Sequence, residues 1–499
     1  MKSLAKTLNL IERLGNKLPD PITIFFVLSV AIVLISAIAS ATDLQVVHPG
    51  TQETVTAVSL LNGAGIRRII TEAVKNFINF PPLGTVLVAM LGVGVAEATG
   101  LLGALLRQGV LLTPPMLLTP GIVFLGVMSN LAADAGYVVL APLGALIFLA
   151  FGRHPLAGLA AAFAGVSGGY SANLLIGSLD PLLAGISQSS AQLIEPSYVV
   201  NPTANYYFMA ASTVLITLLG WLITDKVVEP RLGSFQGDSS AELASLTTQE
   251  RKALRWAGFA LLAVVAAFLV MLLPAQGILR DPETFSLIPS PFFSGIVPII
   301  MLFFLVPGIV YGVVAGTIKS DRDLAQAMSD SMSSMGYYIV LAFFAAQFVA
   351  YFAWSNLGFI LAIKGAGFLE NMGFTGIPLA IAFILVSAFI NLFIGSASAK
   401  WNIMAPVFVP MLMLLGYSPE FTQLAYRIGD STTNIITPLM PYSPVIVAFA
   451  NKYDSKLRIG TLIAMMLPYA IAFLVGWTIF LIIWFVLGLP IGVGAEIGL

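Results

Sequence analysis

The chain has 499 residues, of which 58% are hydrophobic and only 9% are charged, and its formal net charge is −1. Soluble domains carry about 25% charged residues, so the composition argues strongly against a soluble protein, and the charge balance gives no indication of nucleic-acid binding. The chain has no cysteine and only His48 and His154, which rules out disulfides and thiolate catalysis and argues against a histidine metal site or catalytic triad.

Apolar runs of roughly 20 residues recur along the chain, which is the length of an α-helix that crosses a bilayer rather than of a membrane β-strand. We therefore expect an all-α polytopic membrane protein with about nine transmembrane helices, two re-entrant helical hairpins and an inverted internal repeat. The basic residues before the first run place the N-terminus in the cytoplasm by the positive-inside rule. No cleavable signal peptide is predicted.

The first half of the chain is expected to span residues 1–228. In chain order its plain segments are a span at 21–39, an outward segment at 42–82, a span at 84–106 and a span at 206–227. The polar stretch SNLAADAG, flanked by two short apolar arms, predicts a re-entrant hairpin at about 117–152. A broken helix is expected at 165–181, where paired glycines and a proline weaken or end a helix.

Residues 229–255 form the most polar loop and predict a cytoplasmic linker to the second half, residues 256–499. In chain order the plain segments there are spans at 256–273, 293–314, 337–354, 377–394 and 459–487, an outward loop at 274–291 and a charged cytoplasmic helix at 319–330. A second hairpin is expected at about 391–416 and a second broken helix at about 419–450, where prolines and polar residues interrupt the apolar sequence.

The interrupted regions of the two halves resemble each other. Residues 132–155 align without a gap on residues 396–419 at an offset of 264 (406 − 142), with matching alanines, glycines and prolines. Further along, GGYSANLL aligns on GDSTTNII at an offset of 261 (434 − 173), which pairs Asn173 with Asn434. Interrupted segments at corresponding positions of two halves are the best sequence indication of a secondary-transporter site.

A broken helix has free N–H groups at one tip, which can hold an anionic substrate, and free carbonyls at the other, which can hold Na⁺. Proline kinks that bind no ligand are the alternative explanation. An ion channel would show a ring-forming pore signature, and an enzyme would need a nucleophile–base pair or a metal set. The sequence shows neither, so we predict a transporter and no enzyme.

Arg427, Asp430 and Asn434 recur at helical spacing and share one face. The planar guanidinium of Arg427 suits a carboxylate or sulfonyl group, and Asp430 could accept from an aromatic amine or carry a proton. Mutual neutralisation of these two charges is the alternative. Trp401 could stack on an aromatic ligand or mark the membrane interface, and its neighbour Lys400 could snorkel to that interface.

Smaller polar groups accompany these residues in the second half. Asn391, Ser396 and Ser398 could contact substrate at the hairpin or bond between helices, whereas Gln423 is expected as a polar residue at a helix entry.

Asp180 follows the first broken helix and has no cation close to it in sequence, so it is a candidate for ion coordination or proton coupling, with a structural role as the alternative. Asn130, Asn173 and Asn434 lie at the interruptions, where amides and unwound carbonyls could coordinate Na⁺. Capping of the broken helix ends is the alternative, as it is for Asp134. Apart from bound Na⁺, no cofactor is expected.

The stretches SNLAADAGYVVLAPLGALIF, SGGYSANLLIGSLDPLL, NLFIGSASAKWNIMAPVFVPML and AYRIGDSTTNIITPLMPYSPVI together resemble the AbgT family of p-aminobenzoyl-glutamate transporters, over nearly the whole chain. Functional positions of the family match here at Asp180, Asn391, Ser398, Trp401, Pro419, Arg427, Asp430 and Pro438. The resemblance implies a substrate class of folate-related p-aminobenzoyl compounds and, in some members, export of sulfonamide antimetabolites.

The resemblance also implies a multi-pass homodimer in the bacterial inner membrane, in which an outer scaffold surrounds an inner core with two hairpins. It implies alternating access coupled to a Na⁺ or H⁺ gradient. Such a substrate offers an aromatic ring to Trp401, carboxylates to Arg427 and an amine to Asp430. The residues by themselves indicate only a small aromatic or carboxylated solute, so a symporter of another small anion stays an alternative, and uptake and efflux are both open.

Overall fold

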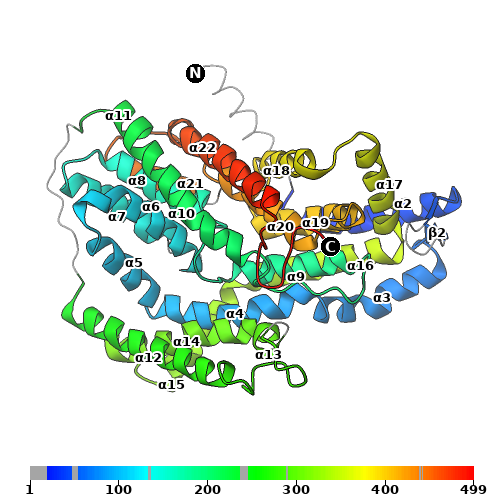
Figure 1. Ribbon diagram of the computed structural model, residues 1–499, viewed down its shortest axis with the longest axis horizontal. Coiled ribbons are helices and arrows are strands. Elements are labelled where there is room, and N and C mark those ends of the chain that lie inside the picture. The colour runs from blue at the N-terminus through cyan, green and yellow to red at the C-terminus, as the bar shows by residue number, and fades with distance from the viewer. Residues whose placement is uncertain are drawn as a thin grey trace.

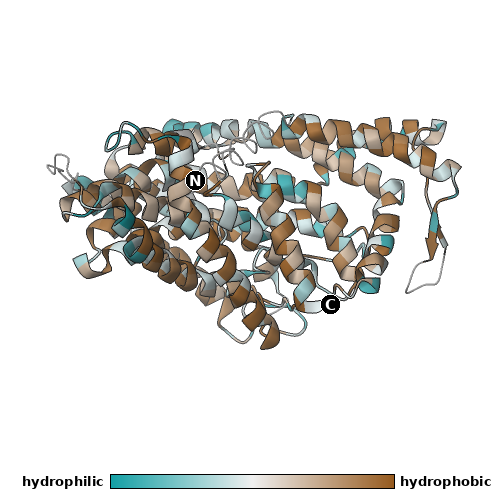
Figure 2. Cartoon of the chain, turned by 90° about the horizontal axis from the view of Figure 1, so that it is seen from above, coloured by the Kyte–Doolittle hydropathy of each residue, from teal (hydrophilic) through white to brown (hydrophobic). Residues whose placement is uncertain are grey.

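The computed structural model describes residues 19–47, 54–132, 136–235, 246–287, 290–437, 440 and 442–499. Helices α19 (Ala397–Leu414) and α20 (Pro419–Thr433) lie in the middle of an elongated helical molecule, while α12 (Thr248–Leu272) and α14 (Ile296–Ala315) run along one edge (Figure 1). Apolar residues predominate along most of the helices (Figure 2).

The elements up to residue 232 are α2 (Pro21–Ala41), β1 (Gln45–Val47), β2 (Thr54–Thr56), α3 (Gly63–Ile78), α4 (Pro81–Ala98), α5 (Leu101–Leu111), η1 (Pro115–Leu117), α6 (Leu118–Met128), η2 (Ser129–Ala132), η3 (Gly136–Leu140), α7 (Ala141–Ala150), α8 (Pro155–Phe163), η4 (Ala164–Gly168), α9 (Leu179–Ala191), α10 (Tyr206–Ile223), η5 (Thr224–Val228) and, within the expected linker, α11 (Glu229–Leu232). Those of the second half are α13 (Pro291–Ser294), α15 (Asp321–Ser334), α16 (Gly336–Trp354), α17 (Leu357–Asn371), α18 (Gly376–Asn391), α21 (Ser443–Ala450) and α22 (Ile459–Val486).

Within the described residues, 8 helical segments are long and apolar enough to cross a membrane, or up to 9 if the bent pair Leu101–Leu111 and Pro115–Leu131 counts as one span. This confirms the expected all-helical membrane fold with about nine spans. Strands β1 and β2, which the sequence analysis did not anticipate, pair antiparallel as a short hairpin between α2 and α3.

The segment 42–82, expected to lie outside the membrane, contains helix α3, which leads through a short break into α4. Together they form a candidate span of 36 residues, Gly63–Ala98. Asn62 begins α3, because its side-chain oxygen accepts a hydrogen bond from Gly65 N at 2.7 Å. This helix was not predicted because its polar residues interrupt the apolar run that would indicate a membrane span.

The span expected at 84–106 is divided in the structure. Helix α4 ends at Ala98, and Gly100 adopts a left-handed backbone with φ 88°, which only glycine reaches at little cost. Helix α5 then begins a new direction, and the chain bends by 114° between Leu101–Leu111 and Pro115–Leu131. The apolar run is continuous in sequence, so only the backbone at Gly100 shows the division.

The predicted interruptions fall where helices end. They lie between α6 and η3, between η4 and α9, between α18 and α19, and between α20 and α21. At each place backbone groups are left without helical partners. The division into two halves stays a prediction, and α12 begins within the expected linker at Thr248, where Thr247 and Glu250 form a capping box.

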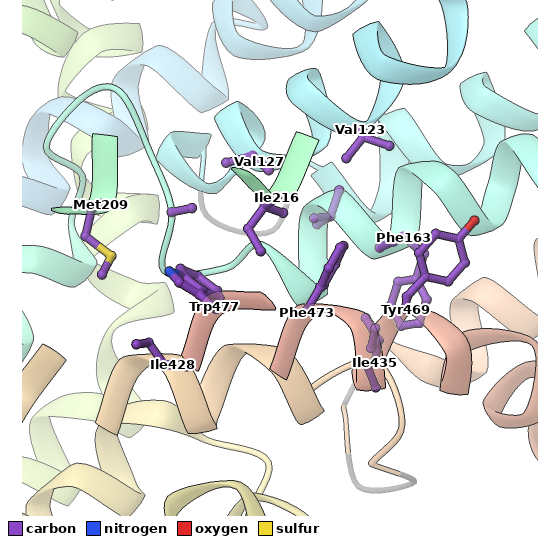
Figure 3. Close-up of a cluster of buried hydrophobic side chains, with 14 of the residues drawn as sticks. Val123, Val127, Phe163, Met209, Ile216, Ile428, Ile435, Tyr469, Phe473 and Trp477 are labelled. Atoms are coloured by element: carbon purple, nitrogen blue, oxygen red, sulfur yellow. The ribbon is translucent and has the colours of Figure 1, made fainter. Parts of the chain in front are cut away.

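Helix α20 is buried along its whole length, and α9, α18, α19 and α22 pack around it. Its close approach to α18 depends on Gly429, because a Cβ atom there would lie 2.4 Å from the carbonyl oxygen of Ile384. On another side, Ile428 and Ile435 contact an apolar cluster to which α22 contributes Tyr469, Phe473 and Trp477 (Figure 3). The polar residues of α20 are therefore enclosed by protein.

Substitution Gly429→Ala is expected to destabilise the protein, because the added methyl group overlaps the backbone of α18 and overpacking costs about 1–3 kcal/mol. The measurement is the Tm of the purified protein in detergent. Gly460→Ala is the matched control, since a Cβ at Gly460 meets nothing within 4 Å. Equal Tm values for the two variants would contradict the tight contact.

Candidate functional site

Helix α20 carries two charged side chains into the protein interior. Ser418 starts the helix by accepting a hydrogen bond from Phe421 N at 3.1 Å, and Pro419 occupies the first turn, where its missing N–H costs nothing. Arg427 and Asp430 are 3% and 1% exposed. Burial of a charge is costly unless it is paired, and each of these charges takes a partner from another helix.

Arg427 pairs with Asp180, which lies in the first turn of α9. The distance between Arg427 Nη1 and Asp180 Oδ1 is 2.7 Å, and Arg427 Nη2 donates to the carbonyl oxygen of Ser171 at 3.1 Å. Asp180 Oδ2 also accepts from Gly177 N at 2.8 Å. The guanidinium of the second half thus binds both ends of the broken region in the first half.

A small pocket opens beside this ion pair, lined by Ser171, Asn173, Leu175, Ile176, Asp180, Pro202, Tyr206, Met209 and Arg427. The side chain of Asp180 is 14% exposed there. Arg427 Nε is buried and has no hydrogen-bond partner among the described residues. The Arg427–Asp180 ion pair therefore lines a small pocket formed mainly by residues 171–209, and Arg427 also carries a buried donor without a partner among the described residues.

Asp430 pairs with Lys400 of α19, and the side chain of Lys400 is 0% exposed. The lysine ammonium also contacts Asn391 Oδ1 at the end of α18. The amide nitrogen of Asn391 lies 2.6 Å from the carbonyl oxygen of Asp430 and 2.9 Å from Asn434 Oδ1. Lys400 thus lies in the interior and not at the interface, and Arg427 and Asp430 do not neutralise each other.

Trp401 is fully buried against another aromatic ring of the site. Its ring stacks on Tyr426 with a centroid distance of 4.5 Å and an interplanar angle of 23°. Its Nε1 donates to Ser187 Oγ at 2.9 Å, while Tyr426 OH donates to the carbonyl oxygen of Ala397 at 2.6 Å. In this conformation the stacking face next to Tyr426 is occupied, so an aromatic ligand would have to displace that ring or use another face.

A buried chain of hydrogen bonds extends the site toward the start of α20. Ser187 Oγ donates to Gln423 Oε1 at 2.7 Å, and Gln423 Nε2 donates to Asn205 Oδ1 at 2.8 Å. Asn205 Nδ2 then donates to the carbonyl oxygen of Glu420 at 2.9 Å. Gln423, expected only as a helix-entry residue, therefore joins two residues of the first half.

Sequence reasoning missed Ser187, Asn205 and Tyr426. Ser187 follows Asp180 by seven residues on α9, which is a helical spacing that would have placed both on one face. Tyr426 stands next to Arg427 in sequence, but nothing local distinguishes it from an ordinary buried tyrosine. Asn205 precedes an apolar helix in a pattern shared by many capping residues, so no local signal identified it.

The three asparagines expected as possible sodium ligands fall into two groups. Asn130 Nδ2 and Asn173 Nδ2 both donate to the carbonyl oxygen of Val127, at 3.1 and 3.3 Å. Asn434 instead contacts Asn391. No contact among the described residues joins Asn434 to the other two, so one set of three ligands is not assembled in this conformation.

The remaining expected positions are more peripheral. The carbonyl oxygen of Ser398 accepts from Asn402 Nδ2 at 2.9 Å, and its hydroxyl lies 3.3 Å from that of Ser396, the N-cap of α19. Pro419 is buried at the start of α20. Pro438 and Asp134 lie outside the described residues.

The two asparagine groups occupy equivalent places in the repeat. With a three-residue gap between Asn130 and the segment that begins at residue 132, Asn130 matches Asn391 at an offset of 261 (391 − 130), the offset at which Gly169 matches Asp430 (430 − 169). Asn130 Nδ2 reaches the carbonyl oxygen of Gly169 at 3.5 Å, just as Asn391 Nδ2 reaches that of Asp430 at 2.6 Å. Matching side chains thus bind matching carbonyls, which supports the repeat inferred from the sequence.

A multi-pass helical protein with paired helix breaks around buried charges has the features of a membrane transporter. The AbgT transporter family matches residues 6–499, and the chain belongs to this family. The sequence prediction of a transporter rather than an enzyme is therefore confirmed by family membership.

The p-aminobenzoyl-glutamate transport protein of Escherichia coli (strain K12) is 43% identical over 484 residues, which cover 97% of this chain and 95% of that protein. The structure of the Alcanivorax borkumensis YdaH transporter matches with a TM-score of 0.92 and 47% identity, covering 95% of this chain and 100% of that one. The structure of Neisseria gonorrhoeae MtrF, which is described among a class of antimetabolite efflux pumps, matches with a TM-score of 0.93 and 50% identity. The match covers 98% of this chain and 100% of that one.

The coupling between Arg427 and Asp180 can be measured with a double-mutant cycle. Arg427→Gln and Asp180→Asn are each expected to lower stability, by up to about 3–5 kcal/mol for loss of one buried partner. The double variant should lose less stability than the sum of the two single losses, because neither charge is then left unpaired. The readout is urea or thermal unfolding of the purified protein, and strictly additive losses would contradict the pair.

Proposed function

We propose that this transporter is an ion-gradient-coupled secondary active transporter of p-aminobenzoyl-glutamate or of related p-aminobenzoate and sulfonamide compounds. The observation that carries the proposal is the Arg427 guanidinium, which lines the small pocket beside Asp180. A guanidinium binds carboxylate and sulfonyl oxygens in a planar, bidentate manner. The substrate named for the Escherichia coli relative contains such groups, and antimetabolites are the cargo of the Neisseria gonorrhoeae class.

Substrate and ion are linked through competition for Arg427. When a substrate anion takes the guanidinium, the Asp180 carboxylate loses its counter-charge in a largely buried place. An uncompensated buried carboxylate is costly, so Asp180 then gains a proton or Na⁺. Binding of substrate and binding of the ion thereby favour each other, which is the thermodynamic requirement of coupled transport.

The second charged group recognises the other end of the substrate. The Asp430 carboxylate can accept from the aromatic amine of a p-aminobenzoyl group, and Trp401 and Tyr426 supply apolar ring surface beside it. Asn391, Ser398, Pro419 and Pro438 are proposed to complete the substrate site. A carboxylate symporter for another small anion would use Arg427 in the same way but would have no need for an aromatic wall.

The asparagine groups are the proposed sodium positions. Carbonyl and amide oxygens are suitable ligands for a hard cation, and Asn130, Asn173 and Asn434 lie where helices end and carbonyls are free. Among the described residues, no cluster of three or more acidic, histidine or cysteine side chains provides a separate metal site. The proposed assembly is a homodimer in the bacterial inner membrane with a cytoplasmic N-terminus.

Transport should depend on the buried charges and the stacked ring. Arg427→Ala, Asp430→Ala and Trp401→Ala are each expected to abolish uptake of p-aminobenzoyl-glutamate or a sulfonamide into liposomes, without loss of membrane expression. Lys75→Ala is the control, because Lys75 is 69% exposed and pairs only with Glu72. Transport at the control rate in all three site variants would show that the assigned site is wrong.

The same liposomes can identify the coupling ion and the direction of transport. Imposed Na⁺ and pH gradients of each sign should drive substrate in opposite directions when reversed, because alternating access runs according to the gradients. Only the coupled ion should have this effect. Equal flux under every gradient would exclude coupled transport and leave facilitated diffusion through the same site.

A further inference from the structure

Lys400 is a fully buried cation whose ammonium is held only by oxygen atoms in the described part of the chain. It lies in the second turn of α19 and contacts Asn391 Oδ1 and one oxygen of Asp430. Its side chain is 0% exposed. Taking an ammonium ion out of water costs several kcal/mol, so a lysine here needs a reason beyond packing.

The equivalent place in the first half has the same acceptor but no lysine. Asn130 matches Asn391 at the offset of 261, while Lys400 matches Gly136 at the offset of 264 (400 − 136). A Cβ at Gly136 would lie 2.1 Å from Ser129 Oγ and 2.8 Å from Ser129 Cβ, so a larger residue there would require the Ser129 side chain to move. Asn130 Oδ1 is buried without a hydrogen-bond partner among the described residues.

The matching asparagine oxygens of the two halves, Asn391 Oδ1 and Asn130 Oδ1, therefore have different surroundings. In the second half the asparagine oxygen faces a positive charge that belongs to the chain. In the first half the matching oxygen has no donor in the described part of the chain, and the residue at the position that matches Lys400 is glycine. Ammonium groups and alkali-metal ions carry the same charge and are both held by oxygen ligands, so one can substitute for the other.

We propose that Lys400 is a built-in cation, whose ammonium replaces in the second half the free monovalent cation that the first half receives. The inference extends the ion coupling of the proposed function. It implies that the Lys400 position, which includes Asn391 and its neighbour Asn434, takes no free ion in the natural protein. It so narrows the proposed sodium positions to Asn130 and Asn173. It also keeps Asp430 compensated throughout the cycle, so Asp430 can bind substrate without gaining an ion.

The test removes the lysine and asks whether a free cation can take its place. Lys400→Ala leaves both the space and the oxygen ligands. Lys400→Met is the matched control, because the methionine side chain removes the charge but fills the space. The double variant Lys400→Ala/Asp430→Asn removes both charges. Tm of each purified full-length protein is measured in choline, sodium, lithium and methylammonium chloride at equal ionic strength, relative to the unsubstituted protein.

In choline, Lys400→Ala is expected to have a Tm lower by about 3–5 °C, because Asp430 is left without a counter-charge. Sodium, lithium or methylammonium should raise this Tm in a saturable manner. The Tm of Lys400→Met should stay low in every salt, and the Tm of the double variant should not depend on the cation. Transport by Lys400→Ala should recover with the same cation at the same concentrations.

The proposal is overturned if Lys400→Ala responds equally to all four salts, or if Lys400→Met regains stability as well. It is also overturned if Lys400→Ala cannot be purified in any of these salts, whether or not the double variant folds. The position would then admit no free cation, or the lysine stem would serve only packing. Because Tm requires no substrate, these outcomes are separate from a failure of the proposed substrate or direction.

Discussion

Charge burial is the constraint on which the centre of the molecule depends. Helix α20 is buried from end to end, yet it carries Arg427 and Asp430. Neither charge could be kept there without a partner, and the partners come from different helices: Asp180 from α9 and Lys400 from α19. The positions of these helices relative to α20 are therefore set by electrostatics as well as by apolar packing.

The two ion pairs differ in what they leave open. Arg427 and Asp180 line a small pocket, and Arg427 Nε has no hydrogen-bond partner among the described residues. Lys400 and Asp430 are almost wholly enclosed, and their side chains also contact Asn391 and Tyr426. The two pairs therefore differ in how far protein encloses them.

Burial also separates the inner helices from those that face lipid. In the apolar window of α12 only 6% of residues are buried, whereas in that of α19 the share is 72%. Helix α12 packs mainly against α14 and leaves most of its apolar surface uncovered by the described protein. Helices α19 and α20, which hold the charges, contact protein on all sides and resemble the interior of a soluble domain.

Much of this architecture was determined by the sequence itself, because it depends on neighbouring residues. Apolar runs specify spans, glycines and prolines specify helix breaks, and the offsets of 264 and 261 relate the two halves. The family, the transporter class and several central residues followed from these local patterns. Helix α3 and the break at Gly100 did not follow from local patterns. The polar residues of α3 interrupt its apolar pattern, and the break at Gly100 lies within a continuous apolar run.

Only the tertiary structure decided which charges meet. Arg427 pairs with Asp180, which is 247 residues away in sequence (427 − 180), and not with Asp430, which is one helical turn away on the same helix. Residues three apart on a helix can pair, so the sequence favoured neither partner. The choice depends on where α9 and α19 pack around α20, and such long-range packing is not encoded by any local pattern of residues.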